Sequence, residues 1–257
     1  MLTIIKNSER ERTMMIMRVD TFFIYLACAV LLILFYVVKN AIKRWCENPV
    51  YLPKEIDSFE KHLEQNFGPV KSVFHQVVPN EMHVDIYVIE PTEKNPCYRL
   101  FTCGMGAKKM EIPLEFNGKR PDRIELMLSL PADWKLDIES LENANFYWPV
   151  GLMEYLAQFP WREATWLGFG HTIPLQKFAE NTELSGVLLN YPENYPYTAG
   201  HIDLPRGTVQ FLNIVPLYNE EMDYKLASGL ESLEKLMGES LYAPIDPKRK
   251  NYSSCCE

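Results

Sequence analysis

Two short histidine and aspartate pairs are the groups in this sequence whose types and spacing could support chemistry. His83-Val84-Asp85 and His201-Ile202-Asp203 each place an imidazole and a carboxylate two residues apart. In an extended segment such side chains point the same way, so each pair could hold a metal ion or polarise a water molecule. Neither pair has a third ligand at a recognisable spacing, which favours a structural role on a polar strand face. A metal ion shared between the two pairs is the alternative that the sequence leaves open.

His171 is a further histidine in a suggestive setting. It lies in the glycine-rich stretch Gly168–Thr172, but this stretch lacks the Gly-Lys-Ser/Thr ending and the following helix of a phosphate-binding loop. We interpret residues 172–174 as a tight turn in which His171 bonds to backbone or to a carboxylate. A hydrolase using His83, Asp85 and His171 is the weakest functional alternative, because the sequence lacks a nucleophile–base pair, a metal signature and a cofactor loop. We therefore predict no catalytic residue, no metal ligand and no cofactor.

Three tyrosines form a candidate of another kind. Tyr191, Tyr195 and Tyr197 lie in the irregular stretch Asn190–Gly200, NYPENYPYTAG. Tyrosine offers a large contact area at a low cost in side-chain entropy, so this loop is the stretch that most resembles a protein interface. A loop that simply packs over the core is the alternative.

Composition limits the classes of function. The chain has 257 residues and 47% hydrophobic content, which suits a substantial core in one large domain or two small ones. Its formal net charge of −8 argues against a nucleic-acid-binding protein, because phosphate binding requires a basic surface. The six cysteines form no CxxC pair and no zinc spacing, which indicates free thiols in a reducing compartment.

The N-terminal part contains an uncharged apolar run. Residues 21–38, TFFIYLACAVLLILFYVV, are long enough to cross the roughly 30 Å hydrocarbon layer of a membrane as a helix. A signal peptide has a shorter apolar region and a small-residue cleavage site, whereas Lys39 and more basic residues follow this run. A buried soluble helix would have a polar face. We predict a single-pass transmembrane helix between an N-terminal tail, residues 1–20, and a juxtamembrane linker, residues 39–53.

Basic residues near this helix set its predicted orientation. They are balanced, with Lys6, Arg10, Arg12 and Arg18 before it and Lys39, Lys43, Arg44 and Lys54 after it. A chain that starts at Met14, Met15 or Met17 instead of Met1 loses most of the first group. The cluster after the helix then dominates, and the positive-inside rule places the large domain in the cytoplasm.

Strands and helices alternate after the linker and must position the candidate residues. The predicted strands are 70–78, 82–90, 98–102, 123–130, 186–190 and 209–217, and the predicted helices are 54–67, 148–159 and 220–241. Pro160 is expected to stop the second helix, and Gly229 weakens the third. This order predicts an α+β fold, with a mainly antiparallel sheet packed against helices and preceded by one transmembrane helix.

Several of these segments resemble one family in a fixed order. HVDIYVIEPT at residues 83–92, YRLFTCGMG at 98–106 and IELMLSLPADW at 124–134 are similar to the Suppressor of Fused domain family, which has H-x-D-I, L-x-T-x-G-M and L-P-x-x-W segments at like separations. The similarity continues through WPVGLMEYLAQFP, WLGFGHTIP and the strand and helix of residues 209–237. It defines a domain over residues 54–243, followed by a basic, polar tail, 244–257, that we expect to be disordered.

The resemblance implies a non-catalytic protein-interaction domain. Animal members sequester transcription factors by gripping an extended peptide, and bacterial relatives are regarded as immunity proteins that neutralise toxins. With its single domain, the chain looks like a bacterial member. We predict a membrane-anchored immunity-type protein that sequesters a protein partner, such as a toxin, as a domain or an extended peptide. A membrane-anchored scaffold or regulatory peptide-binding protein is the alternative. The residues expected to contact the partner are His83, Asp85, Glu125, His171, Tyr191, Tyr195 and Tyr197.

Overall fold

The chain divides into two units, Met1–Asn48 and Pro49–Glu257. The computed structural model describes residues 25–42, 50–75, 82–192 and 196–255. The first unit contributes the apolar helix Tyr25–Ile42, which is long and apolar enough to cross a membrane, although a signal sequence meets the same criteria. This helix overlaps the predicted span and continues beyond it to Ile42, while residues 21–24 lie outside the described part.

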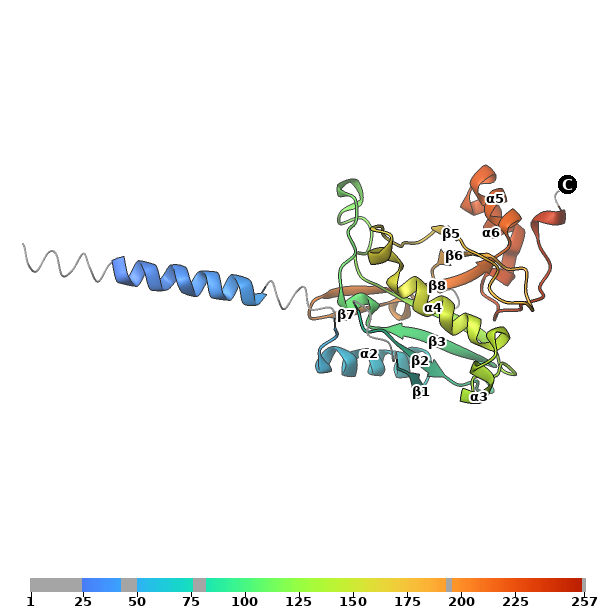
Figure 1. The fold of residues 1–257 in the computed structure, drawn as a ribbon, viewed down its shortest axis with the longest axis horizontal. Helices are drawn as coiled ribbons and strands as arrows, with labels where there is room; N and C mark the ends of the chain where they lie inside the picture. The colour runs from blue at the N-terminus through green and yellow to red at the C-terminus, as the bar shows by residue number, and fades with distance from the viewer. Residues whose placement is uncertain (1–24, 43–49, 76–81, 193–195, 256–257) are drawn as a thin grey trace, which may run out of the picture. The chain divides into compact units, whose positions relative to one another are not determined.

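One eight-stranded sheet organises the second unit (Figure 1). The strands are β1 (Val70–Phe74), β2 (Asp85–Ile89), β3 (Cys97–Cys103), β4 (Ile124–Pro131), β5 (Thr172–Pro174), β6 (Gly186–Asn190), β7 (His201–Leu204) and β8 (Gly207–Leu217). Their order is β1-β2-β3-β4-β8-β6-β5, and β7 pairs with β8 off this path. All the pairs are antiparallel except the parallel pair of β4 and β8. The predicted α+β class with a mainly antiparallel sheet is confirmed.

Helices cover both faces of this sheet. They are α2 (Pro53–Asn66), α3 (Ile138–Leu141), α4 (Ala144–Arg162), α5 (Asn219–Ser228) and α6 (Leu230–Met237), with 3-10 turns η1 (Met105–Ala107), η2 (Leu114–Phe116), η3 (Tyr197–Gly200), η4 (Gly238–Leu241) and η5 (Ser253–Cys255). Side chains alternate along β4: Leu126 and Leu128 join the core beneath α4, whereas Met127 joins the core beneath α2. Figure 1 shows α4 lying across the front of the sheet. Because β4 is covered on both faces, most of its residues are apolar, with Glu125 and Ser129 as the exceptions.

Three local predictions differ from the structure. Helix α4 does not stop before Pro160 but continues to Arg162, because a proline in the last turn removes only one helical hydrogen bond and its ring is buried in the core. The predicted helix 220–241 is broken at Gly229, whose φ of +88° ends α5 and begins α6. Residues 172–174 form edge strand β5 rather than a tight turn, since they pair with β6.

The strands β6 and β7 follow one another along the same edge of β8. Asn190 at the end of β6 pairs with Asn213, and His201 at the start of β7 pairs with Gln210. The tyrosine-containing stretch Asn190–Gly200 therefore connects two strands, β6 and β7, that both pair with β8.

The C-terminal segment is ordered against α5, in contrast to the expected disordered tail 244–257. Arg249 donates from Nη1 to Glu221 Oε1 at 2.6 Å and from Nη2 to the carbonyl oxygen of Pro216 at 2.9 Å. The backbone N–H of Tyr252 donates to the same Glu221 carboxylate at 3.0 Å. A basic and polar composition suggested a solvated tail, but one buried acid, Glu221, holds residues up to 252; residues 256–257 lie outside the described part.

Candidate functional site

The predicted contact residues fall in four places on the second unit. His83 and Asp85 lie at the start of β2, Glu125 lies inside the sheet on β4, His171 precedes β5, and Tyr191 follows β6. Tyr195 is outside the described residues, and Tyr197 begins η3, where only its backbone is described. The structure therefore brings His83 together with Asp85, whereas His171 and Tyr191 belong to two neighbouring groups of aromatic rings near β5.

Glu125 is fully buried and accepts four hydrogen bonds. Its Oε1 accepts from Tyr51 Oη at 2.8 Å, from the Gly104 N–H at 2.9 Å and from the Gly106 N–H at 2.8 Å, and its Oε2 accepts from Thr102 Oγ1 at 2.6 Å. Its side chain has no exposed area, so it has no surface with which to contact a partner. Its position instead fixes the turn that follows β3, because two of the donors are backbone amides of that turn.

The electrostatics of this cluster favour a partly protonated carboxyl. Burial raises the pKa of Glu125 to about 7, while the hydrogen bonds from Thr102, Gly106, Gly104 and Tyr51 act in the opposite direction. The turn that Glu125 holds cannot carry a side chain at Gly104, where φ is +128° and a Cβ atom would lie 2.3 Å from the carbonyl oxygen of His83. The glycine therefore allows the turn to pack directly against the backbone of His83.

Two imidazoles converge on the carboxylate of Asp85. His75 Nδ1 lies 3.2 Å from Asp85 Oδ2, and His83 Nε2 lies 3.0 Å from Asp85 Oδ1. The ligand atoms of all three residues lie within 4.8 Å of one another. These are the residues in the described part of the chain that could hold a metal ion, and the third member, His75, was missed at the level of the sequence. The sequence carries no local signal for it, because only the β1–β2 register places His75 opposite Asp85.

The second histidine and aspartate pair does not join this group. Asp203 Oδ1 accepts a hydrogen bond from Thr208 Oγ1 at 2.5 Å across the β7–β8 turn. Within the described ranges, the group of possible ligands contains neither His201 nor Asp203, so the shared metal ion of the two pairs is not supported. His171 is also absent from that group. The three residues of the hydrolase alternative, His83, Asp85 and His171, therefore do not form one cluster of possible ligands in the described ranges.

Two groups of aromatic side chains lie near β5, and we refer to them together as the aromatic surface. It consists of Phe116, Trp166, Phe169, His171 and Tyr191. The rings of Phe116 and Trp166 have centroids 5.6 Å apart, those of Trp166 and His171 are 4.3 Å apart, and Phe169 stacks on Tyr191 at 4.5 Å with an interplanar angle of 9°. Phe116 is 36% exposed and Tyr191 is 41% exposed. Three distant segments of sequence thus contribute half-exposed rings beside the edge strand β5.

Cations border this aromatic surface. Lys225 of α5 donates from Nζ to the carbonyl oxygen of Gly170 at 2.7 Å and to Thr172 Oγ1 at 3.3 Å. Burial lowers the pKa of His171, and the nearby charges of Lys225 and Arg120 lower it further. His171 is therefore neutral at physiological pH, when it can accept or donate a hydrogen bond at the surface.

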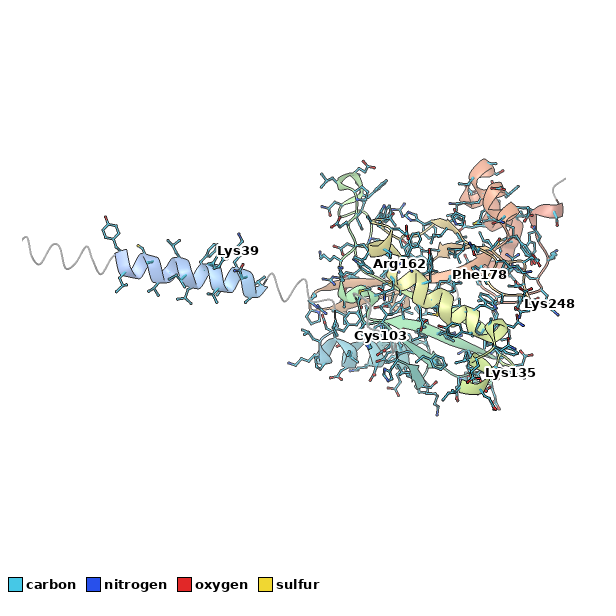
Figure 2. All side chains as sticks on the ribbon, viewed as in Figure 1. Lys39, Cys103, Lys135, Arg162, Phe178 and Lys248 are labelled. Atoms are coloured by element: carbon cyan, nitrogen blue, oxygen red, sulfur yellow. The ribbon has the colours of Figure 1, made fainter. Side chains whose placement is uncertain are left out.

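The described cysteines carry no disulfide bridge. Cys28, Cys97 and Cys103 are free thiols. Burial raises the pKa of Cys103 well above its ordinary value, and the nearby Glu125 raises it further, so its reactive thiolate form is disfavoured. Cys103, labelled in Figure 2, pairs with Asp85 across β2 and β3.

Comparison with known proteins supplies a family for this arrangement. The profile of the Suppressor of fused protein (SUFU) family matches residues 80–250 of the 257-residue chain. The chain belongs to the SUFU family. An uncharacterized protein of Ureaplasma parvum serovar 3 is 27% identical over 213 residues, which cover 80% of this chain and 98% of that protein. The predicted resemblance is confirmed.

A chain of known structure shares the fold of this SUFU chain. A chain of the Sufu–Fu complex has a TM-score of 0.56 at 18% identity, and the match covers 80% of this chain and 94% of that one. A SUFU homolog from Neisseria gonorrhoeae has a TM-score of 0.48 at 17% identity, with 77% of this chain and 93% of that chain covered. The family match ends at residue 250, so the SUFU domain includes Arg249, which holds the C-terminal segment in place.

Proposed function

We propose that this SUFU protein is a non-catalytic, membrane-anchored immunity-type protein that sequesters a protein partner. The observation that carries the proposal is its SUFU domain, since SUFU domains form a family of protein-binding modules and one solved relative comes from a Sufu–Fu complex. The immunity role and a toxin as partner come from the resemblance to bacterial relatives of the SUFU family.

The aromatic surface is our proposed contact region. Exposed aromatic rings supply a large share of binding energy at protein interfaces, and this surface presents Tyr191 stacked on Phe169. Strand β5 lies beside it at the end of the strand order, but Pro174 has no backbone N–H and so limits the pairing of an added strand. We therefore favour a partner that docks through side chains, with acidic groups facing Lys225 and Arg120.

Co-expression tests the immunity role. The protein encoded by the gene next to this one is produced in a host with and without the full-length chain, because immunity genes lie directly beside those of their toxins. Protection of growth together with a stable complex supports the proposal. A stable complex without any toxicity of the partner supports the scaffold alternative instead, and a lack of both overturns the proposal.

A pair of tyrosine variants tests the contact region. Tyr191→Ala is expected to weaken the complex at least about tenfold, in the range of interface residues that matter for binding. Tyr147→Ala is a matched control, because Tyr147 is 39% exposed but lies on α4, where its hydroxyl donates to Glu154, and it is not one of the five residues of the aromatic surface. Equal losses in the two variants, measured by calorimetry on folded protein, would assign the contact to another region.

A further inference from the structure

Three potential metal ligands meet at one end of the β1–β2 pair, and this feature does not depend on the proposed function. We propose that His75, His83 and Asp85 bind a divalent transition-metal ion of the zinc class. The two His–Asp contacts, 3.2 Å to Oδ2 and 3.0 Å to Oδ1 of Asp85, bring two nitrogen ligands to the two sides of one carboxylate, and the ligand atoms of the three residues lie within 4.8 Å of one another. Two of the five histidines in the chain contact this one carboxylate.

The sheet itself sets the convergence. The register pairs Val73 with Tyr87 and Phe74 with Ile86, so the next residue of each segment brings His75 opposite Asp85. Side chains of directly opposed residues lie on the same face of an antiparallel pair. His83 precedes Asp85 by two residues, which is the spacing that puts two side chains on one side of an extended segment.

The backbone of His83 is held from behind. Its carbonyl oxygen packs against Gly104, where a Cβ atom would approach to 2.3 Å, and the Gly104 N–H donates to the buried Glu125 at 2.9 Å. The hydrogen bonds of Glu125 thus hold the turn in place, and the turn holds the backbone of His83 near Asp85. A ligand whose main chain is supported in this way loses little freedom when it binds an ion.

Ion pairing alone is a weak explanation for this cluster. The side chains of His75 and His83 are 71% and 50% exposed, whereas that of Asp85 is 16% exposed. Exposed charge pairs contribute little to stability, so neither ring needs a carboxylate partner. Zinc lies about 2.0 to 2.2 Å from nitrogen and oxygen ligands, which separates neighbouring ligands by roughly 3.4 Å. That separation lies between the two His–Asp contacts of 3.0 and 3.2 Å and the 4.8 Å within which all three ligand atoms lie.

The ligand set selects the class of ion. Two imidazoles and one carboxylate suit Zn²⁺, Co²⁺ or Ni²⁺, whereas Mg²⁺ and Ca²⁺ prefer oxygen ligands throughout. Both rings face solvent, so water would complete the coordination shell. Three protein ligands and one water form the open type of zinc site.

Metal titration of the untagged full-length protein in detergent tests the proposal. After dialysis against a chelator, Co²⁺ is added and its visible absorption is recorded, and Zn²⁺ affinity is measured by calorimetry. We expect one ion per chain. His75→Ala, His83→Ala and Asp85→Asn are each expected to weaken Zn²⁺ binding at least about tenfold, since even outer partners of metal ligands affect affinity by about 10 to 100-fold.

The second His-x-Asp pair provides the control. Asp203→Asn alters the same sequence pattern at a carboxylate that bonds to Thr208 and should leave Zn²⁺ affinity unchanged. His75→Ala is the decisive variant, because its exposed ring leaves the fold intact when removed, which circular dichroism verifies. Wild-type protein that binds no Co²⁺ or Zn²⁺, full affinity in folded His75→Ala, or an equal loss in Asp203→Asn would each overturn the proposal.

Discussion

Glu125 shows how one buried carboxylate organises a turn. Its four hydrogen-bond donors come from Tyr51, Thr102, Gly104 and Gly106. Removal of the Glu125 carboxylate leaves all four donors without this acceptor. We expect Glu125→Ala to lower the free energy of unfolding by about 3 kcal/mol or more, because each buried donor without an acceptor costs about 1 to 3 kcal/mol. Glu125→Gln keeps one acceptor oxygen and should cost less. Urea unfolding followed by fluorescence provides the measurement; similar losses in the two variants would contradict this account.

The same residue should make stability depend on pH. Burial raises the pKa of Glu125 from its ordinary 4.5 to about 7, so the folded protein binds this proton more tightly than the unfolded chain does. The resulting stabilisation is complete below about pH 4.5 and is lost as the pH rises through about 7, a change of about 3 kcal/mol from this group. Urea unfolding at pH 5, 6 and 7.5 should show a smaller decline in Glu125→Gln than in wild type. Parallel declines would argue that other groups cause the dependence.

At the scale of elements, a buried ion pair clamps α2 to the β7–β8 turn. Arg206 donates from Nε to Glu55 Oε1 at 2.9 Å, and the two side chains are 2% and 1% exposed. Arg206→Ala leaves the Glu55 charge buried without its cation and should destabilise the fold by about 3 to 5 kcal/mol.

Two further variants check this reasoning by urea unfolding. The double change Glu55→Met with Arg206→Met removes both charges and should recover much of the loss. Lys235→Ala breaks an ion pair with Glu231 whose side chains are 75% and 83% exposed, and we expect a loss below about 1 kcal/mol. If the double variant is as unstable as Arg206→Ala, packing rather than the unpaired charge explains the effect.

The C-terminal segment offers another test at this scale. Arg249 neutralises Glu221, whose side chain has no exposed area, and itself is 13% exposed. Arg249→Ala should therefore lower the free energy of unfolding by about 3 kcal/mol and release the segment to proteases. Limited proteolysis with mass spectrometry should detect early cleavage after residue 243 in the variant only. A wild-type protein cleaved equally fast there would restore the view of a disordered tail.

For the whole molecule, the fate of the apolar helix decides the location of the protein. If the helix is an anchor, as proposed, the mature protein retains residues 25–42 and stays with membranes during carbonate extraction, since a helix of this length spans the hydrocarbon layer. Mass spectrometry of purified protein supplies the first measurement. A mature N-terminus beyond Ile42 would identify a signal sequence instead.

Much of the fold was predictable because its signals are local. The alternating apolar positions of β2 and β8 and the spacing of α2 depend only on neighbouring residues. Pairings between distant segments leave no such signal: the parallel contact of β4 with β8 joins Ile124 to Gln210.

The candidate site was less predictable for the same reason. His75 becomes a candidate ligand only because the β1–β2 register places it opposite Asp85. Glu125 looked like a surface residue because it is an acid in a strand, and only the burial of both faces of β4 reveals its role. The aromatic surface unites Phe116 with Trp166 across a loop whose folding the sequence pattern does not describe.

The place of β8 also bears on how the protein is made. This strand lies in the middle of the sheet, between β4 and β6, yet it comes from residues 207–217, near the end of the chain. During synthesis, one edge of β4 stays unpaired until β8 has left the ribosome, because the two strands are far apart in the sequence. The sheet can be completed only after most of the polypeptide has been made. A membrane helix made first would already be inserted by then. The domain would thus assemble late, and a prematurely terminated chain would lack a completed sheet.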